Sequence, residues 1–318
     1  MHNNNNTDEK NFQDLLDKSQ SKRSDILRAA ALAHGSGMKE TQIARMQTCG
    51  YYLTFLHDRD MSKSCLETGF FCGNRMCPAC AWRKSVEDAV KIACILQAAV
   101  NSKYKLLFAT LTAANVEAHE LTAAVKKYST AYTDLMRQGQ YKNIAGALRK
   151  IEITYNDKTC LYHPHIHSVW IVSRSWRPPS HKNLAADWAH QLDYEYRVSA
   201  NAQDIRTVRS ATHADILEFA KYPAKSADML KNEDTFKTFY RAMHGARLIT
   251  YLRLARKLST MYKSGELDMY KKTDLTEYVY RSAWKWNTAG YELDRLYELD
   301  EPIRLGKKNT DETAGDND

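Results

Sequence analysis

One short segment, YHPHIHSVWIV at residues 162–172, constrains the fold of this chain more than any other. Side chains on a β-strand point alternately to its two faces, so His165 and His167 share one face while Ile166 points to the other. The apolar residues that follow indicate a strand that continues into a core. The strand-like segment ALRKIEITY precedes it, and NDKTCLYHP between them indicates a turn. The sequence therefore predicts an antiparallel hairpin with two imidazoles on one face.

A carboxylate on the first strand of this hairpin completes a candidate metal site. If NDKT forms the turn, Glu152 lies opposite His165 or His167 and on the same face. Two histidines and one carboxylate leave coordination positions open for a substrate, and this mixture of nitrogen and oxygen ligands suits Mn²⁺ or Mg²⁺. The alternative is that the histidines face solvent and bind nothing.

The size and charge of the chain limit the class of protein. Its 318 residues, 43% of them hydrophobic, can bury one large core or two modest ones. No run approaches the ~18 apolar residues of a membrane span, and the first residues lack the pattern of a signal peptide, so we expect a cytoplasmic protein without a membrane partner. The formal charge of +8 favours a polyanionic partner.

The order of helical and strand patterns predicts an α+β fold, in which a small antiparallel sheet carries helices on one face and follows a cysteine-rich module. The expected strands are 51–56, 103–112, 147–155, 165–173 and 202–210, and the expected helices are 24–34, 41–46, 82–100, 116–136, 181–192, 211–222 and 245–259. The predicted division is a disordered polar tail at 1–22, a helical and cysteine-rich zinc module at 23–100, a core with the sheet at 101–232, a helical C-terminal region for DNA binding or dimerisation at 233–305, and an acidic tail at 306–318.

A second group of polar residues lies in the segment EFAKYPAKSAD. Glu218 and Tyr222 are four residues apart and therefore neighbours on one helix face, with Lys221 and Lys225 close by. Pro223 perturbs the helix directly after the tyrosine. A tyrosine forms a covalent intermediate when a metal polarises the electrophile or a cation stabilises the phenolate, and a nearby glutamate can activate water. The alternative is an amphipathic helix with the tyrosine as a half-buried anchor.

Three closely spaced cysteines indicate a second metal site. Cys72, Cys77 and Cys80 have the spacing C-x4-C-P-x-C, and in a reducing compartment such a cluster suits a tetrahedral zinc ion. A closed site needs a fourth ligand, and Cys49, which Gly50 follows, is our first choice. Cys65 and His57 are the alternatives, whereas Cys94 and Cys160 are expected to pack in the core.

Three segments in this order resemble the motifs of a known family. LLFATLTAAN, YHPHIHSVW with Glu152 upstream, and EFAKYPAKSAD are similar to the three motifs of plasmid rolling-circle replication initiators of the Rep_1 type. FCGNRMCPACAWRKS extends the resemblance, which covers roughly residues 45 to 230. It implies that residues 101–232 form the core of an HUH endonuclease, with a central antiparallel sheet flanked by helices.

The resemblance also implies a role for each site residue. His165 and His167, with Glu152 as third ligand, would hold a divalent metal over the scissile phosphate. Tyr222 would attack that phosphate, which leaves a 5′-phosphotyrosyl link and a free 3′-OH, and Glu218 would activate water for the terminating cleavage. Lys221 and Lys225 would be partners of the phosphate or phenolate. On general strand grounds, Thr110 and Thr112 are expected to be core strand residues beside the site.

The implied partner is plasmid origin DNA, cut at a double-strand origin in a single-stranded hairpin, and replication from the nick implies a host helicase, a polymerase and a single-strand-binding protein. Origin specificity would lie outside the sheet, in the zinc module, where Trp82, Arg83 and Lys84 begin a helix, or in the C-terminal helices, including the segment at 278–291. Two alternatives stay open: an HUH transposase or mobilisation relaxase, and a non-enzymatic zinc-containing DNA-binding regulator.

Overall fold

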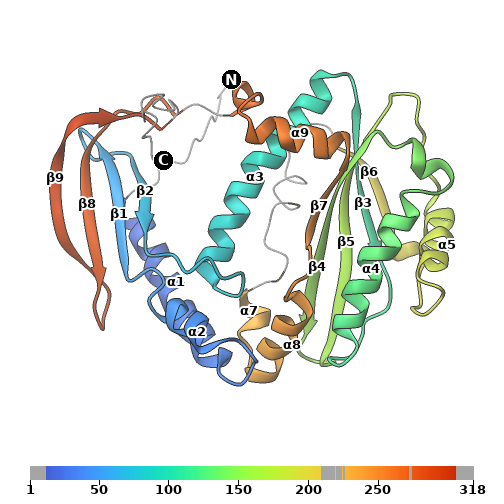
Figure 1. Cartoon of the computed structure of the whole chain (residues 1–318), viewed down its shortest axis with the longest axis horizontal. Coiled ribbons are helices and arrows are strands. Elements are labelled where there is room, and N and C mark those ends of the chain that lie inside the picture. The colour runs from blue at the N-terminus through green and yellow to red at the C-terminus, as the bar shows by residue number, and fades with distance from the viewer. Residues whose placement is uncertain (1–11, 209–218, 220–223, 225, 272–273, 306–318) are drawn as a thin grey trace, which may run out of the picture.

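The computed structural model describes residues 12–208, 219, 224, 226–271 and 274–305. They form two antiparallel sheets with the long helix α3 between them, so the predicted α+β class is confirmed (Figure 1). Within these residues, no helix is both long and apolar enough to cross a membrane.

The five-stranded sheet has the strand order β6-β3-β5-β4-β7. Figure 1 shows α4 and α5 on its outer face. The opposite face packs against α3 and α9, which gives the sheet a second apolar layer. The strands are β3 (Lys105–Thr112), β4 (Gly146–Asn156), β5 (Leu161–Val172), β6 (Asp204–Val208) and β7 (Ile249–Arg253), and the helices are α3 (Pro78–Asn101), α4 (Leu121–Leu135), α5 (His181–Gln191) and α9 (Leu254–Lys263).

The hairpin of β4 and β5 forms as the sequence predicts. Its turn is stabilised by the Asn156 side chain, which accepts hydrogen bonds from the backbone N–H groups of Lys158 and Thr159. Cys160 closes the turn with a φ of 56°, in the left-handed region. The alternating pattern then continues unbroken along both strands, with Glu152 opposite His165.

The four-stranded sheet, in the order β2-β1-β8-β9, joins two distant parts of the chain. All four strands pair antiparallel, and the predicted ranges 23–100 and 233–305 each contribute one hairpin to it. The strands are β1 (Tyr52–Asp58), β2 (Ser64–Gly69), β8 (Tyr278–Trp286) and β9 (Tyr291–Ile303).

The prediction of a helical C-terminal region over 233–305 is wrong for its second half, which forms strands β8 and β9. Residues 278–303 form a hairpin because their aromatic and β-branched side chains suit a strand and because β1 offers an open edge. The turn is fixed by Asn287, whose side chain accepts hydrogen bonds from the N–H groups of Ala289 and Gly290.

The single helix predicted over 245–259 is likewise corrected. Residues 249–253 form strand β7 on the edge of β4, and α9 begins only at Leu254. Arg253, at the junction, has a φ of 52°, which a continuous right-handed helix does not allow. The helix predicted over 211–222 lies outside the described residues except for Phe219.

The predicted polar tail is too long. Helix α1 (Phe12–Ala33) begins within the range 1–22, because its apolar side chains pack on the four-stranded sheet. The Phe12 ring meets Phe55 edge to face at 5.2 Å, and Leu16 is buried beside it. The remaining helices are α2 (Glu40–Gln47), α7 (Ser226–Met229) and α8 (Glu233–Met243), with short 3₁₀ turns at Gly139–Asn143, Ala200–Ala202 and Asp268–Tyr270.

Candidate functional site

The two histidines and the glutamate of the predicted metal site lie together on the five-stranded sheet. His165 and His167 alternate with Ile166 along β5, and Glu152 on β4 is directly opposite His165. They occupy the face of the sheet that packs against α3, since Phe108, next to His167 at 5.3 Å between ring centres, belongs to that apolar layer. The predicted register of the hairpin is thus confirmed.

The ligand atoms have the spacing that a divalent cation requires. The Nε2 atoms of His165 and His167 are 3.1 Å apart, and Nε2 of His167 is 3.6 Å from Oε2 of Glu152. One atom from each of the three residues fits within 4.8 Å of the other two. Neighbouring ligands of an octahedral ion at 2.0–2.1 Å are about 3.0 Å apart, so the three side chains fit a Mg²⁺-like ion that keeps its other positions open.

A buried lysine completes the charge balance of this site. Lys150 lies two residues before Glu152 on the same face of β4, and its Nζ donates a hydrogen bond of 2.9 Å to Oε2 of Glu152. Burial alone would raise the pKa of Glu152, but the charge and hydrogen bond of Lys150 outweigh it, so that pKa lies below its usual value. Lys150 is not among the predicted site residues, although the alternation that places Glu152 on this face also places Lys150 there.

Burial favours the neutral form of two histidines of the strip, His163 and His167, and a metal ligand needs that form. Burial, followed by the proximity of His165, lowers the pKa of His167 to about 3 and that of His163 to about 4. His163 lies on the same face and stacks on His165, with 4.9 Å between ring centres. All three imidazoles of the opening segment therefore line one polar strip.

Two threonines of β3 contact this strip. The hydroxyl of Thr110 lies 3.3 Å from Nδ1 of His167, and the hydroxyl of Thr112 forms a hydrogen bond with Nε2 of His163. The expectation that they are core strand residues is correct for their position but incomplete, because each orients an imidazole of the site. A ligating histidine is commonly fixed in this way through its other ring nitrogen, as His167 is by Thr110.

The predicted nucleophile and its neighbours, Tyr222, Glu218, Lys221 and Lys225, lie outside the described residues. Two described residues that flank them, Phe219 and Ala224, both contact the sheet. Phe219 is buried and meets Phe108 edge to face, at 6.5 Å between ring centres. Ala224 forms a parallel β-bridge with Ile153, the residue after Glu152.

The four cysteines chosen for the zinc site come together between α2 and the start of α3. The sulfur of Cys49 lies 3.5 Å from that of Cys77 and 3.6 Å from that of Cys80, which is also 3.6 Å from Cys72. These distances exclude disulfides, which need about 2.05 Å, and approach the roughly 3.8 Å between thiolates around a tetrahedral zinc. The donor set therefore fits a closed zinc site.

The surroundings of the thiols also suit bound thiolates. The backbone N–H of Cys72 points to the sulfur of Cys49, and that of Gly73 to the sulfur of Cys80. Hydrogen bonds from the other three thiols, that of Cys49 first, lower the pKa of Cys80, whereas hydrogen bonds within the cluster raise the pKa of Cys49 and of Cys77. Hydrogen bonds to ligand atoms of this kind orient a metal's ligands and spread their charge.

The other candidate ligands are placed elsewhere. Both ring nitrogens of His57 are occupied by the hydroxyls of Ser64 and Ser282, at 2.7 and 2.6 Å, and Cys65 lies on β2 outside the cluster. Cys94 is buried in the core as predicted. Cys160 is exposed, which corrects the prediction that it packs in the core, because it occupies the hairpin turn.

Comparison with known proteins identifies the class that this site and fold define. The family model Rep_1, described as "Replication protein", matches residues 63–292, a stretch that includes the histidine strand and three of the four clustered cysteines, all but Cys49. "Protein rep" of Streptococcus pneumoniae is 30% identical over 242 residues, which cover 73% of this chain and 75% of that protein. "Protein rep" of Staphylococcus aureus is 31% identical over 198 residues, which cover 61% and 86%, respectively. No solved structure matches the chain.

These matches define a plasmid replication initiator. The chain belongs to the Rep_1 family of replication proteins, and the predicted resemblance is confirmed.

Proposed function

We propose that this protein starts rolling-circle replication by cutting one strand of its plasmid origin, with Tyr222 as the nucleophile. The observation that carries the proposal is the cluster of Glu152, His165 and His167, whose spacing fits a divalent cation with open positions. In the sequence, Tyr222 lies between Phe219, which contacts Phe108 next to His167, and Ala224, which pairs with the residue after Glu152, and these two contacts support the proposal.

The proposed reaction is an in-line displacement at phosphorus. The phenolate oxygen of Tyr222 forms a bond to the scissile phosphorus, the bond from phosphorus to the 3′ oxygen breaks, and a proton restores the free 3′-OH. A divalent cation at the triad would neutralise charge that develops on the non-bridging oxygens. The 5′-phosphotyrosyl bond conserves the energy of the cleaved ester, so the same site can later join strands without ATP.

The remaining residues have supporting roles in this proposal. Lys150 keeps Glu152 ionised and in position, and Thr110 orients the ring of His167. Glu218 acts as base for the water that ends the cycle, and Lys221 and Lys225 stabilise the phosphate or the phenolate.

The thiol cluster has a structural role. Cys49, Cys72, Cys77 and Cys80 would hold a zinc ion that joins the loop before β1 to the first turn of α3. An ion closed in by four thiolates offers no position to a substrate, so it supports the fold and takes no part in cleavage.

The proposed partner is single-stranded origin DNA, and the replication reaction then requires a helicase, a polymerase and a single-strand-binding protein of the host. We place the protein in the cytoplasm because its template is plasmid DNA. The match to replication proteins favours this function over a transposase or relaxase with the same residues.

The test is cleavage of 3′-end-labelled single-stranded DNA from the origin of its own plasmid, with Mn²⁺ or Mg²⁺, followed by denaturing gels. We expect a metal-dependent, protein-linked labelled fragment that disappears in Tyr222→Phe and persists in Glu218→Ala. Origin DNA that is bound tightly but never cut would favour the non-enzymatic regulator instead.

A further inference from the structure

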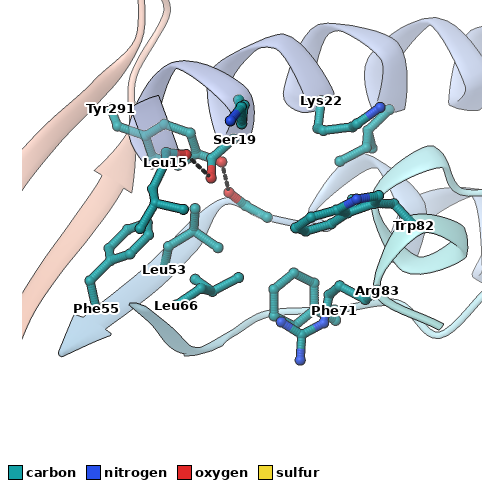
Figure 2. Close-up of a pocket in the computed structure, with 14 residues that line it drawn as sticks. Leu15, Ser19, Lys22, Leu53, Phe55, Leu66, Phe71, Trp82, Arg83 and Tyr291 are labelled. Atoms are coloured by element: carbon teal, nitrogen blue, oxygen red, sulfur yellow. Dashed lines mark hydrogen bonds between the residues drawn. The ribbon is translucent and has the colours of Figure 1, made fainter. Parts of the chain in front are cut away.

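A pocket of about 140 Å³ opens between α1, the first two strands and the start of α3, away from the metal triad. Its walls are almost entirely apolar, and no lining residue comes from the five-stranded sheet. The polar atoms at its back are already occupied, since the hydroxyl of Tyr291 donates to the carbonyl of Gly50 and that of Ser19 to the carbonyl of Leu15 (Figure 2). The apolar floor consists of Leu15, Ile26, Leu53, Phe55 and Leu66.

The mouth of this pocket is aromatic and cationic. Figure 2 shows the Arg83 side chain against Phe71, and Trp82 and Lys22 line the same pocket. The guanidinium of Arg83 lies 3.9 Å from the centre of the Phe71 ring, and Trp82 keeps 46% of its surface exposed. A large exposed indole beside a stacked arginine offers two flat surfaces for another planar group.

Within the part of the chain that the structure describes, the positive charges at the mouth have no acidic partner. Lys18, Lys22 and Arg83 line the pocket, no acidic residue does, and among the described residues no carboxylate lies within 4.0 Å of their charged groups. The next residue along α3, Lys84, differs in this respect because it pairs with Glu87 and Asp88. The free charges of the mouth therefore suit an anion held next to an apolar, planar group.

A nucleotide has this combination of properties. We propose that the pocket takes one unstacked pyrimidine base of single-stranded origin DNA, with the adjoining phosphates against Lys18, Lys22 and Arg83. Aromatic surfaces inside a cationic groove are the usual means of holding single strands. The size favours a pyrimidine, because a cavity of about 150 Å³ holds a single six-membered ring such as benzene.

This site rests on the proposed function only in taking origin DNA as its ligand. It would hold the strand at a point separate from the cleaved phosphate, and it gives the cysteine cluster a further role. Ala79, between Cys77 and Cys80, and Gly50, after Cys49, both line the pocket, so the four thiols fix two of its walls.

The test compares two fluorescent strands of equal length and charge, an oligo-dT and the same strand without bases, by anisotropy with the full-length protein. The wild type should bind the dT strand more tightly than the abasic strand and more tightly than oligo-dA. Trp82→Ala should lower dT affinity about 5- to 100-fold and leave abasic affinity unchanged, and Trp82→Phe should restore most of the loss. Lys22→Gln should weaken the binding of both strands. It should also reduce by about 1 the slope with which the logarithm of the affinity falls against the logarithm of the salt concentration.

Lys84→Gln is the matched control, since it removes a charge that is already paired and that lies on α3 close to Trp82. It should leave the difference in affinity between the dT and abasic strands unchanged. If Trp82→Ala and the wild type showed the same difference in affinity between the dT and abasic strands, the proposal would be wrong, and a protein segment would be the better candidate for the ligand of the pocket. If the wild-type protein does not cleave origin DNA, the proposed nicking function is wrong but the proposed pocket is not affected, because the preference for dT is measured without cleavage.

Discussion

Lys150 and Glu152 form an ion pair inside the five-stranded sheet, with 2.9 Å between Nζ and Oε2 and no solvent exposure for the lysine side chain. The pair lies next to His167, whose Nε2 is 3.6 Å from the same carboxylate oxygen. A buried lysine is costly unless a charge compensates it, so each member of the pair depends on the other for its ionised state. The candidate metal site therefore depends on four residues: the three candidate ligands Glu152, His165 and His167, and Lys150, which positions Glu152.

Replacing Lys150 with methionine should weaken metal binding. Without the ammonium, burial raises the pKa of Glu152 and its side chain loses an anchor, so we expect the affinity for Mn²⁺ at neutral pH to fall about 10- to 100-fold. Titration calorimetry with Mn²⁺ measures this change. Lys231→Met, which breaks the surface pair with Asp157, is the control and should leave the affinity unchanged. Equal affinities for the two variants would contradict the role of Lys150.

The metal-free protein should lose stability in mild acid. The pKa values of His163, about 4, and His167, about 3, lie below the unfolded value near 6.5, so the unfolded chain binds more protons between these limits. Stability should therefore be highest above pH 6.5 and fall as the pH drops towards 4, by an amount on the order of 2 kcal/mol after allowance for partial solvent contact.

Urea unfolding in EDTA at several pH values tests this slope. A double variant with His163→Gln and His167→Gln should have a flatter profile between pH 4 and 6.5, because the two groups that take up protons on unfolding are gone. His119→Gln, a change at an exposed position, is the control. A profile in the double variant as steep as that of the wild type would assign the acid sensitivity to other groups.

The parts of the site that could be predicted depend on local geometry. A short turn and strict alternation place Glu152 opposite His165 without knowledge of the rest of the fold. Lys150 was missed because a lysine in a strand is normally solvated, and its burial depends on β7, which pairs with β4 from about a hundred residues further along.

The C-terminal hairpin was missed for a similar reason. Its basic and aromatic residues predict a helical DNA-binding surface, but Tyr278–Trp286 pairs with β1 at the other end of the chain. Such a contact leaves no trace in local sequence periodicity, and a polar residue such as Ser282, which is buried against His57, further disguises the strand.

Loss of one thiol should remove the structural metal. We expect Cys49→Ser to lower the zinc content from about one ion per chain towards zero and to lower Tm, because three ligands leave the site open and the loop before β1 loses its link to α3. Zinc content by mass spectrometry and thermal unfolding measure the two effects. Cys160→Ser, in the exposed turn, and Cys65→Ser, on β2, should change neither. A Cys65→Ser variant that lost zinc instead would assign the fourth ligand to β2.

Phe219 offers a way to test whether the segment with Tyr222 depends on its attachment to the sheet. Phe219→Leu removes the edge-to-face contact with Phe108 beside His167 but keeps an apolar side chain in the same layer. We expect the rate of origin cleavage to fall at least several-fold, because a small displacement of a nucleophile is costly, while Mn²⁺ affinity stays unchanged.

Phe236→Leu is the matched control, since Phe236 is equally buried but belongs to the apolar layer of the other face. Both variants should lose a similar free energy of unfolding, about 1 kcal/mol. Single-turnover cleavage rates separate them: equal rates in the two variants would mean that Phe219 contributes only to the core, whereas a specific loss in Phe219→Leu would place its role at the metal triad.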